Sequence, residues 1–224
     1  MNLPLSKRLL TCAGFVAPGD RVADIGCDHG YLGIYLLQQG IASSVIASDV
    51  NEQPLQCAVI NAEKYGFRDK MTFYLSDGVR NIPRDFDCMV WAGMGADTMI
   101  SILEAAPWLR SSQYRMILQC QSKTPMLRKY LSDNGWRIAR ETVLRDGRFL
   151  YTVMEVLWEP GCEKLTVGQQ HITPALLGDS APELEEYCRW VVEGLKIATR
   201  HKSDPDKEQA LKELSGIFEW MEDA

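Results

Sequence analysis

The first 135 residues alternate short apolar runs with segments whose apolar residues recur at helical spacing, and this alternation constrains the fold most strongly. The strand-like runs cover residues 22–25, 44–48, 71–75, 86–92 and 115–120. The helix-like patterns cover residues 5–13, 53–65, 97–106 and 125–134. Strands and helices alternating at this spacing predict an α/β fold with a doubly wound, largely parallel sheet. A binding site is then expected at the carboxyl ends of the strands.

The alternation of strands and helices ends after Gly135, because residues 136–144 and 149–158 are both rich in strand formers. The four residues between them include Asp146-Gly147, a dipeptide typical of hairpin turns. The sequence therefore predicts an antiparallel hairpin that completes the parallel sheet. This arrangement resembles the Rossmann-like fold of class I S-adenosylmethionine methyltransferases, a similarity of fold that does not by itself assign an activity.

The chain is expected to divide into two units. Residues 1–160 are predicted to form a catalytic domain that binds S-adenosylmethionine, and residues 161–224 a linker and a C-terminal helical hairpin. Prolines and glycines predict a loop over residues 159–179. Apolar residues then recur at three- and four-residue steps in 184–198 and again in 211–221. We interpret these two stretches as antiparallel helices, packed as a two-stranded coiled coil.

The amino-acid composition excludes some classes of protein but does not show what this protein binds. The net charge is -6, so binding to nucleic acid would need a local basic face. No apolar run is long enough for a membrane span, and the N-terminus lacks the apolar region of a signal peptide. The seven cysteines show no Cys-x-x-Cys spacing, which disfavours disulfides and zinc. We therefore expect a cytoplasmic protein without bound metal or membrane contact, monomeric or weakly self-associating.

The turn after the first strand, VADIGCDHGYLG over residues 22–33, is glycine-rich but acidic. Dinucleotide-binding folds place a second glycine where this chain has Asp28, and a carboxylate there would repel a diphosphate. The same carboxylate suits S-adenosylmethionine, which carries a sulfonium and an ammonium. We expect Gly26 and Cys27 to approach the methionine end of this cofactor and Asp24 to bind its ammonium. His29 is either a further cofactor contact and proton acceptor or a residue that packs at the helix start.

Acidic residues also follow the second and third strands. Asp49, followed by Val50, stands about two dozen residues after the glycine turn, where an acid can accept both ribose hydroxyls. Asp77-Gly78 ends the third strand, where it could contact the adenine edge. Aspartate and glycine are also common in turns, which is the alternative explanation at each position. Three acids at three successive strand ends are nevertheless consistent with one cofactor pocket.

The fourth and fifth strands are expected to supply the base pocket. Ala92 and Gly93 would complete the cofactor site, and Met94 would touch the face of the target base, unless it only fills the core. The [DN]-P-P-[YFW] motif that is frequent in enzymes acting on exocyclic amines is absent here. Gln119 and Gln121 could read a Watson–Crick edge, with an ordinary loop role as the alternative. We expect Asp28 to stabilise the positive charge that the base acquires.

Taken together, these residues resemble the bacterial tRNA (adenine-22, N1) methyltransferase family, TrmK. The matching segments are LSKRL at 5–9, ADIGCDHGYL at 23–32, AGMG at 92–95, ILQ at 117–119, NGW at 134–136 and DGRFLY at 146–151. The resemblance implies methyl transfer from S-adenosylmethionine to N1 of adenine 22 in the D-arm of tRNA. It places the family's important aspartate at Asp28. The chain departs from the family pattern at Ala96, where glycine is usual, and at Cys120-Gln121, where Pro-Asn is usual.

The tRNA assignment requires positive charge near the site. The candidate phosphate contacts are Lys7, Arg8, Lys123, Arg128, Lys129, Arg200 and Lys202. For any single residue among them, a solvated helix face is the competing interpretation. Two other functions remain open at this point: a small-molecule or other RNA methyltransferase on the same fold, and a non-catalytic RNA-binding protein. Binding of the methyl donor distinguishes the last of these, because a scaffold has no reason to keep three strand-end acids.

Overall fold

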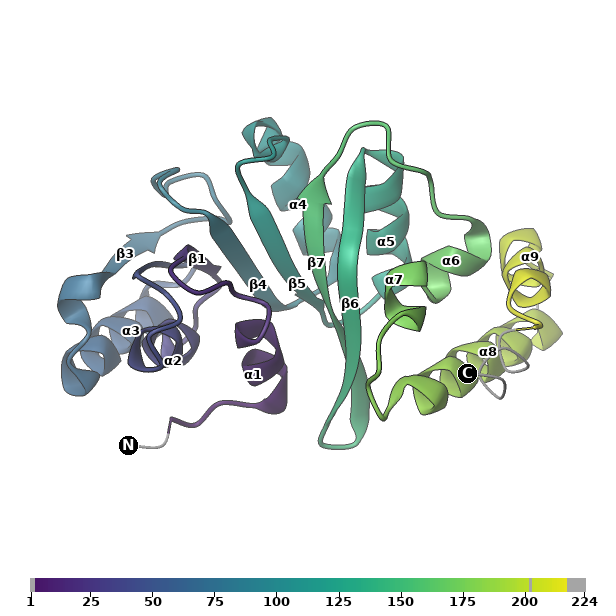
Figure 1. The fold of residues 1–224 in the computed structure, drawn as a ribbon, viewed down its shortest axis with the longest axis horizontal. Coiled ribbons are helices and arrows are strands. Elements are labelled where there is room, and N and C mark those ends of the chain that lie inside the picture. The colour runs from purple at the N-terminus through teal and green to yellow at the C-terminus, as the bar shows by residue number, and fades with distance from the viewer. Residues whose placement is uncertain (1–2, 202, 217–224) are drawn as a thin grey trace.

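The computed structural model describes residues 3–201 and 203–216, and its centre is a seven-stranded sheet with the order β3-β2-β1-β4-β5-β7-β6 (Figure 1). The strands are β1 (Arg21–Ile25), β2 (Ser44–Asp49), β3 (Met71–Leu75), β4 (Cys88–Met94), β5 (Arg115–Cys120), β6 (Trp136–Asp146) and β7 (Phe149–Trp158). The first five pair in parallel, whereas β7 pairs antiparallel with both β5 and β6. The predicted α/β fold with a terminal hairpin is confirmed.

The strand order reverses between β1 and β4, which are neighbours although two strands separate them in sequence. Ile25 of β1 is in register with Ser48 of β2 on one side and with Trp91 of β4 on the other. The loops that follow these strands diverge from this point, so a crevice opens at their carboxyl ends. The topology therefore places the predicted cofactor turn at the expected position for a ligand.

Helices cover both faces of the sheet because its central strands are apolar on both sides. In β1, Val22 packs on one face and Ala23 on the other, and both are fully buried. One face is covered by α1 (Lys7–Ala13), α2 (Tyr31–Gln38) and α3 (Glu52–Tyr65), and the other by α4 (Ala96–Ala105) and α5 (Thr124–Asp133). Two short 3-10 turns, η1 (Arg68–Lys70) and η2 (Pro107–Leu109), complete this domain. None of the helices within the described ranges is long and apolar enough to cross a bilayer.

The C-terminal region contains two short helices where the sequence predicts a loop. These are α6 (Val167–His171) and α7 (Pro174–Leu177), each capped by a threonine. The side chain of Thr166 accepts from the backbone N–H of Gln169, and that of Thr173 accepts from Leu176. The loop prediction for 159–179 is therefore wrong over these residues: capping by threonine outweighs the glycine and prolines that suggested a loop.

The predicted pair of C-terminal helices is present as α8 (Leu184–His201) and α9 (Pro205–Glu213) (Figure 1). α9 begins and ends earlier than the predicted 211–221, because residues 214–216 form a turn. Residues 217–221 of the predicted second helix lie outside the described residues, and the coiled-coil packing stays a prediction. α8 and α9 bury their own small core against β6. Its members include Val143, Ile172, Leu176, Leu184, Tyr187, Cys188, Val192, Leu195, Ala210 and Leu214.

Arg128 is buried, which corrects its predicted role as a phosphate contact. Its guanidinium pairs with the Glu141 carboxylate at 2.5 Å, and neither side chain is exposed. The remaining donors of Arg128 bond to the backbone carbonyls of Gln170 and His171 and to the hydroxyl of Tyr187. Lysine and arginine on an amphipathic helix are usually exposed; here α6 and α8 cover the face that sequence periodicity leaves open. Arg128 thus connects α5 to β6, α6 and α8, and its guanidinium is not available to a phosphate.

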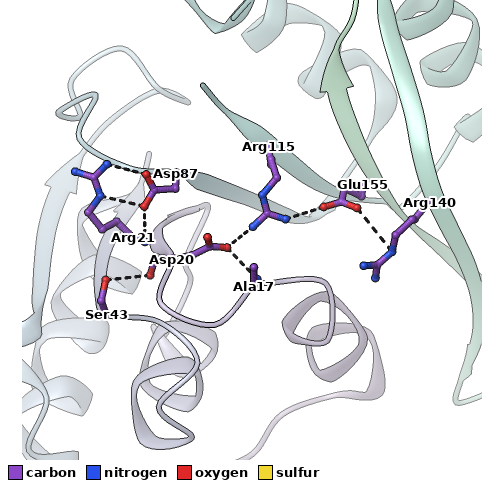
Figure 2. Close-up of polar contacts among 8 residues, drawn as sticks. All are labelled: Ala17, Asp20, Arg21, Ser43, Asp87, Arg115, Arg140 and Glu155. Atoms are coloured by element: carbon purple, nitrogen blue, oxygen red, sulfur yellow. Dashed lines mark hydrogen bonds and ion pairs between the residues drawn. The ribbon is translucent and has the colours of Figure 1, made fainter. Parts of the chain in front are cut away.

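A second polar network lies at the amino ends of the strands, opposite the crevice (Figure 2). Arg115 at the start of β5 pairs with both Asp20 and Glu155, and Glu155 is also approached by Arg140. Arg21 donates from its Nε and Nη2 atoms to the Asp87 carboxylate, at 3.0 and 2.7 Å. These contacts tie the loop before β1 to β4, β5 and the hairpin. The network stabilises the end of the sheet that carries no predicted site residues.

Candidate active site

The turn between β1 and α2 is held by the neighbouring strand. The backbone N–H groups of Gly26 and Cys27 both donate to the Ser48 carbonyl, at 2.8 and 2.9 Å. Gly26 has a φ of +74°, a conformation that favours glycine, and a Cβ atom there would also force the end of the Met94 side chain to move. Asp28 also has a positive φ, 50°, which is uncommon for a residue with a side chain. Its backbone N–H donates to the Asp49 carboxylate at 3.2 Å, which helps to hold the turn in this conformation.

A cavity of about 480 Å³ lies at this turn, between the carboxyl ends of β1 and β4 and the start of α1. The structure brings together many of the predicted site residues in its wall: Asp24, Gly26, Cys27, Asp28, His29, Ala92, Gly93 and Gln119. Ser6, Arg8, Leu9 and Gln121 also contribute to the wall. The sequence had suggested Gln121 as a reader of a base edge and Arg8 as a phosphate contact, but it gave no role to Ser6 or Leu9. The site is therefore built from four segments that are distant in the sequence.

Asp24 is the buried acid of the cavity. Its side chain accepts from the backbone N–H of Gly33, while its Oδ2 atom has no hydrogen-bond partner among the described residues. Burial raises the pKa of Asp24 from 3.8 to about 7, and the nearby charges of Asp49 and Asp28 add to this shift. An unpartnered buried carboxylate oxygen is costly unless a ligand satisfies it. This cavity therefore fits a ligand with a positively charged hydrogen-bond donor.

Asp28 and His29 form the exposed rim of the cavity. The Asp28 side chain is 72% exposed, and one of its oxygens lies 3.6 Å from the His29 Nε2 atom. Cys27 lies behind them and is buried, and burial raises the pKa of its thiol well above the ordinary range. The thiol is therefore protonated and unsuited to act as a nucleophile. The rim offers an acid that can face a ligand, while the cysteine serves packing.

The acids of the second and third strands lie farther out. Asp49 is buried, and it accepts hydrogen bonds from the backbone N–H groups of Asp28 and Asn51, so part of its acceptor capacity holds the turn. Val50 beside it is 62% exposed, which leaves an apolar surface next to the cavity mouth. Asp77 pairs with Arg80 at 3.0 Å. Asp77 and the neighbouring Gly78 are outside the cavity wall, and their contact with a cofactor stays a prediction.

Met94 and Gln119 occupy places that differ from the expected base contacts. Met94 is partly buried, its methyl group lies against Gly26, and it packs on the core, which matches the competing core-filling interpretation. Gln119 is fully buried: its amide oxygen accepts from the Gly93 N–H at 3.0 Å, and its nitrogen donates to the Cys120 carbonyl at 3.1 Å. In this structure the Gln119 amide is committed to backbone groups, and reading of a base edge by Gln119 stays a prediction. Its amide holds the loop at the end of β4.

Arg8 reaches into the cavity from α1. Its Nε donates to the Asp146 carboxylate at 3.0 Å, and its Nη1 donates to the Gln121 amide oxygen at 2.7 Å and to that of Gln119 at 3.4 Å. The guanidinium also lies over the Tyr151 ring, 5.0 Å from its centroid. Sequence reasoning placed Arg8 near the catalytic end as a phosphate contact. The only sign in the sequence was that Arg8 belongs to the LSKRL segment. That segment does not show which residues Arg8 contacts.

A second, larger cavity of about 700 Å³ adjoins the first. It lies between the loop after β5, the β6–β7 turn and α8, and Gln121 lines both cavities. Its wall includes the exposed rings of Phe149 and Trp190 and the side chains of Lys123 and Arg148. Apolar rings and cations on one wall are surfaces on which unpaired bases and phosphates bind.

Of the other predicted RNA contacts, Lys123 lines the larger cavity, and the rest that the structure describes lie on helix surfaces. Lys7 on α1, Lys123 before α5, Lys129 on α5 and Arg200 on α8 are all exposed. Lys123 pairs with Asp97 at 2.8 Å and Lys129 with Asp133 at 2.5 Å. Lys202 lies outside the described residues. An exposed ion pair is weak, so a phosphate can compete for these lysines.

Comparison with known proteins agrees with this site. A family model described as a methyltransferase domain matches residues 5–154. A candidate tRNA methyltransferase from Mycoplasma genitalium is 31% identical over 157 residues, which are 68% of this chain and 69% of that protein. The tRNA (adenine(22)-N(1))-methyltransferase of Bacillus subtilis is 32% identical over 154 residues, which are 68% of this chain and 65% of that protein.

A solved structure extends the similarity beyond the sheet. It is a candidate tRNA (m1A22) methyltransferase from Streptococcus pneumoniae in complex with S-adenosyl-L-methionine, 31% identical with a TM-score of 0.83. The match covers 94% of this chain and 99% of that one, so the C-terminal helices are included. With its acidic glycine turn at the topological switch point, the chain belongs to the bacterial tRNA (adenine-22, N1) methyltransferase family.

Proposed function

We propose that this protein transfers a methyl group from S-adenosylmethionine to N1 of adenine 22 in tRNA. The observation that carries the proposal is the unpartnered, buried Asp24 carboxylate oxygen in a cavity at the β1/β4 switch point. That environment fits the cationic methionine end of the cofactor and disfavours a diphosphate. Family membership and the relatives described above supply the substrate.

The cofactor would be held by residues at the ends of the first strands. Asp24 would accept from its ammonium group, the turn at Gly26 and Cys27 would contact its methionine end, and Asp49 would accept from its ribose hydroxyls. The pair Asp77-Gly78 would approach its adenine, with Val50 as an apolar contact. When bound, S-adenosylmethionine supplies an electrophilic methyl group on a positively charged sulfur.

The protein has little covalent chemistry to perform, because adenine N1 already carries the lone pair that forms the new bond to the methyl carbon. Its task is to hold the base in line with the breaking carbon–sulfur bond and to stabilise the positive charge that passes to the base. Asp28, which lies on the rim of the cavity, would take the second role. Ala92 and Gly93, near the end of β4, would complete the cofactor site.

The tRNA would lie across the exposed lysines and arginines around the two cavities. Lys7, Lys123, Lys129 and Arg200 would contact phosphates, which adds affinity without sequence information. We place this activity in the cytoplasm, where tRNA is modified, and expect a monomer or a weak homo-oligomer. No role for a metal ion is needed in this scheme.

Primer extension tests the proposed reaction. The purified protein is incubated with S-adenosylmethionine and two unmodified transcripts that carry adenine or guanine at position 22. Methylation at N1 blocks base pairing, so the expected result is a polymerase stop at position 22 in the adenine transcript alone. A stop elsewhere, or in both transcripts, would overturn the position or the base. If no stop forms although calorimetry detects binding of the methyl donor, another RNA or a small molecule is the substrate.

A further inference from the structure

The contacts of Arg8 connect three parts of the site that are far apart in the sequence. Its Asp146 partner ends β6, its Gln121 partner follows β5, and Arg8 itself lies on α1. The side chains of Arg8 and Asp146 are only 28% and 25% exposed, so solvent screens their ion pair incompletely. Arg8 therefore acts at the junction of the two cavities, away from the outer surface of α1.

A guanidinium contains five N–H donors and no acceptor, and it therefore fixes the orientation of an amide that it contacts. The oxygen of Gln121 must face Arg8, which turns the amide nitrogen of Gln121 toward the Tyr151 hydroxyl at 3.2 Å. Arg8 also contacts the oxygen of Gln119, but the Gln119 amide is held by two further hydrogen bonds, from the Gly93 N–H and to the Cys120 carbonyl. Loss of Arg8 would therefore free Gln121 far more than Gln119.

We infer that Arg8 is a positioning residue for methyl transfer: it fixes the Gln121 amide, and with it the donor pair of Gln121 and Tyr151, at the junction where the target base enters. This inference rests on the proposed function and deepens it. Gln121 lines both cavities, so it stands between the methyl donor's cavity and the cavity proposed for RNA. An N–H and an O–H held in fixed directions can select a ring acceptor such as N7 and hold the base in one orientation.

The alternative is the phosphate contact that the sequence suggested. A phosphate contact adds affinity for tRNA, acts in the ground state as well as the transition state, and contributes about one unit to the salt dependence of binding. A positioning residue instead acts on the chemical step. A base misplaced by about 1 Å can lose roughly a hundredfold in rate without losing affinity. The two roles therefore separate in kcat and KM.

The experiment measures kcat, the KM for the adenine-22 transcript, and the dissociation constant of S-adenosylhomocysteine for a set of variants. Arg8→Ala should lower kcat about 100-fold, with both binding constants changed by less than about threefold. Arg8→Lys should recover little of this loss, because one ammonium cannot bond to Asp146 and Gln121 in the same fork geometry. Asp146→Asn should lower kcat about tenfold, since it loosens Arg8 without removing it.

Two further variants serve as references. Lys7→Ala removes a neighbouring charge from the exposed side of α1 and should raise KM with kcat little changed. Arg137→Ala removes an arginine–carboxylate pair, with Glu159, from the distant end of β6 and should leave both constants unchanged. The inference is overturned if Arg8→Ala behaves like Lys7→Ala, or if Arg8→Lys restores full activity. A loss of S-adenosylhomocysteine binding together with a large fall in melting temperature would make the role of Arg8 structural.

A spectroscopic readout separates this inference from the proposed function. The side-chain amide signals of Gln119 and Gln121 are followed by nuclear magnetic resonance in the wild-type protein and in Arg8→Ala. Fixed orientation predicts restricted motion of both side-chain amides in the wild type, measured by nuclear spin relaxation, and increased motion of the Gln121 amide alone in the variant. If the Gln121 signals do not change, Arg8 does not position it, whatever the substrate. If wild-type protein fails to methylate the transcript while the Gln121 signals respond, the substrate assignment is the part that fails.

Discussion

Arg128 of α5 and Glu141 of β6 form an ion pair at 2.5 Å in which neither side chain reaches solvent. Glu141 also accepts from the Thr173 hydroxyl at 2.6 Å, and Arg128 bonds to the carbonyl of His171. The pair thus connects α5 and β6 to the segment that contains α6 and α7. Burial of two charges is costly, and the surrounding hydrogen bonds are what make the pair tolerable.

Replacement of Arg128 by methionine should lower the free energy of unfolding by about 3–5 kcal/mol, because Glu141 is left buried without its partner. Urea denaturation followed by tryptophan fluorescence measures this change. The double variant Arg128→Met with Glu141→Leu removes both charges and should recover most of the loss. A single variant that unfolds at the same urea concentration as the wild type would contradict the structural role of the pair.

The affinity for S-adenosylmethionine should rise with pH through neutrality because of Asp24. Its pKa is raised to about 7, and the ionised form is the one that attracts a cation. With that pKa the ionised fraction grows about tenfold between pH 6 and pH 8, and affinity should follow. Isothermal titration calorimetry at the two pH values measures the change. Asp24→Asn, titrated in parallel, should bind more weakly and lose this dependence, which separates Asp24 from the titration of the ligand itself.

The same shift predicts the opposite trend for stability without cofactor. The folded protein holds a proton on Asp24 up to about pH 7, whereas the unfolded chain releases it near 3.8. Between these values the folded state binds more protons, so its stability falls as the pH rises. Asp24→Asn should therefore be more stable than the cofactor-free wild type at pH 8. Equal unfolding midpoints for the two proteins at pH 8 would count against the raised pKa.

Asp28→Asn should lower kcat by about 100-fold or more while the melting temperature changes little. Asparagine tolerates a positive φ as well as aspartate does, so this variant removes the charge and keeps the turn. Asp28→Ala adds backbone strain and should be less stable than Asp28→Asn. Methylation assays at saturating substrate check the first effect, and thermal denaturation checks the second. Near-normal turnover by Asp28→Asn would remove the proposed electrostatic role.

The ion pair of Asp87 and Arg21, at the opposite end of the sheet, should make the stability depend on pH in the acidic range (Figure 2). Hydrogen bonds from Arg21 lower the pKa of Asp87 from 3.8 to about 2. The stabilisation is therefore present above about pH 4 and is lost as the pH falls toward 2. The carboxylate is 41% exposed, so solvent screening limits the effect to about 1 kcal/mol. Asp87→Asn should be less stable than the wild type at pH 7, and the two unfolding curves should converge near pH 2.

Local patterns predicted most of the fold because each strand and helix has its own periodicity. The bounds of β5 and β7 agree with the expected 115–120 and 149–158, and the hairpin turn contracts to Gly147 and Arg148. The helices α6 and α7 were missed, since four or five residues are too few to show a period. Their threonine caps were the available signal.

The site residues that follow from the strand topology could be predicted from the sequence. The hydrogen-bond partners of side chains could be predicted less well. Gly26 and Asp24 follow from strand topology and the acidic turn, and the structure places both in the cavity wall. The burial of Arg128 depends on Glu141 and α6, and the burial of Gln119 depends on Gly93. In both cases the partner is distant in the sequence. A sequence pattern shows which face of an element is polar, but not whether another polar group covers it.

Because β7 lies between β5 and β6, the sheet cannot be completed in the order in which its strands are synthesised. β6 leaves the ribosome first, yet its sheet partner in the described structure is β7, which follows it. A nascent chain that ends before Phe149 therefore leaves the edge of β5 open and β6 without a neighbouring strand. Asp146 cannot be presented to Arg8 until that strand has been added. Unfinished chains therefore lack the strand against which β6 is ordered, and with it the support for the contact between Arg8 and Asp146.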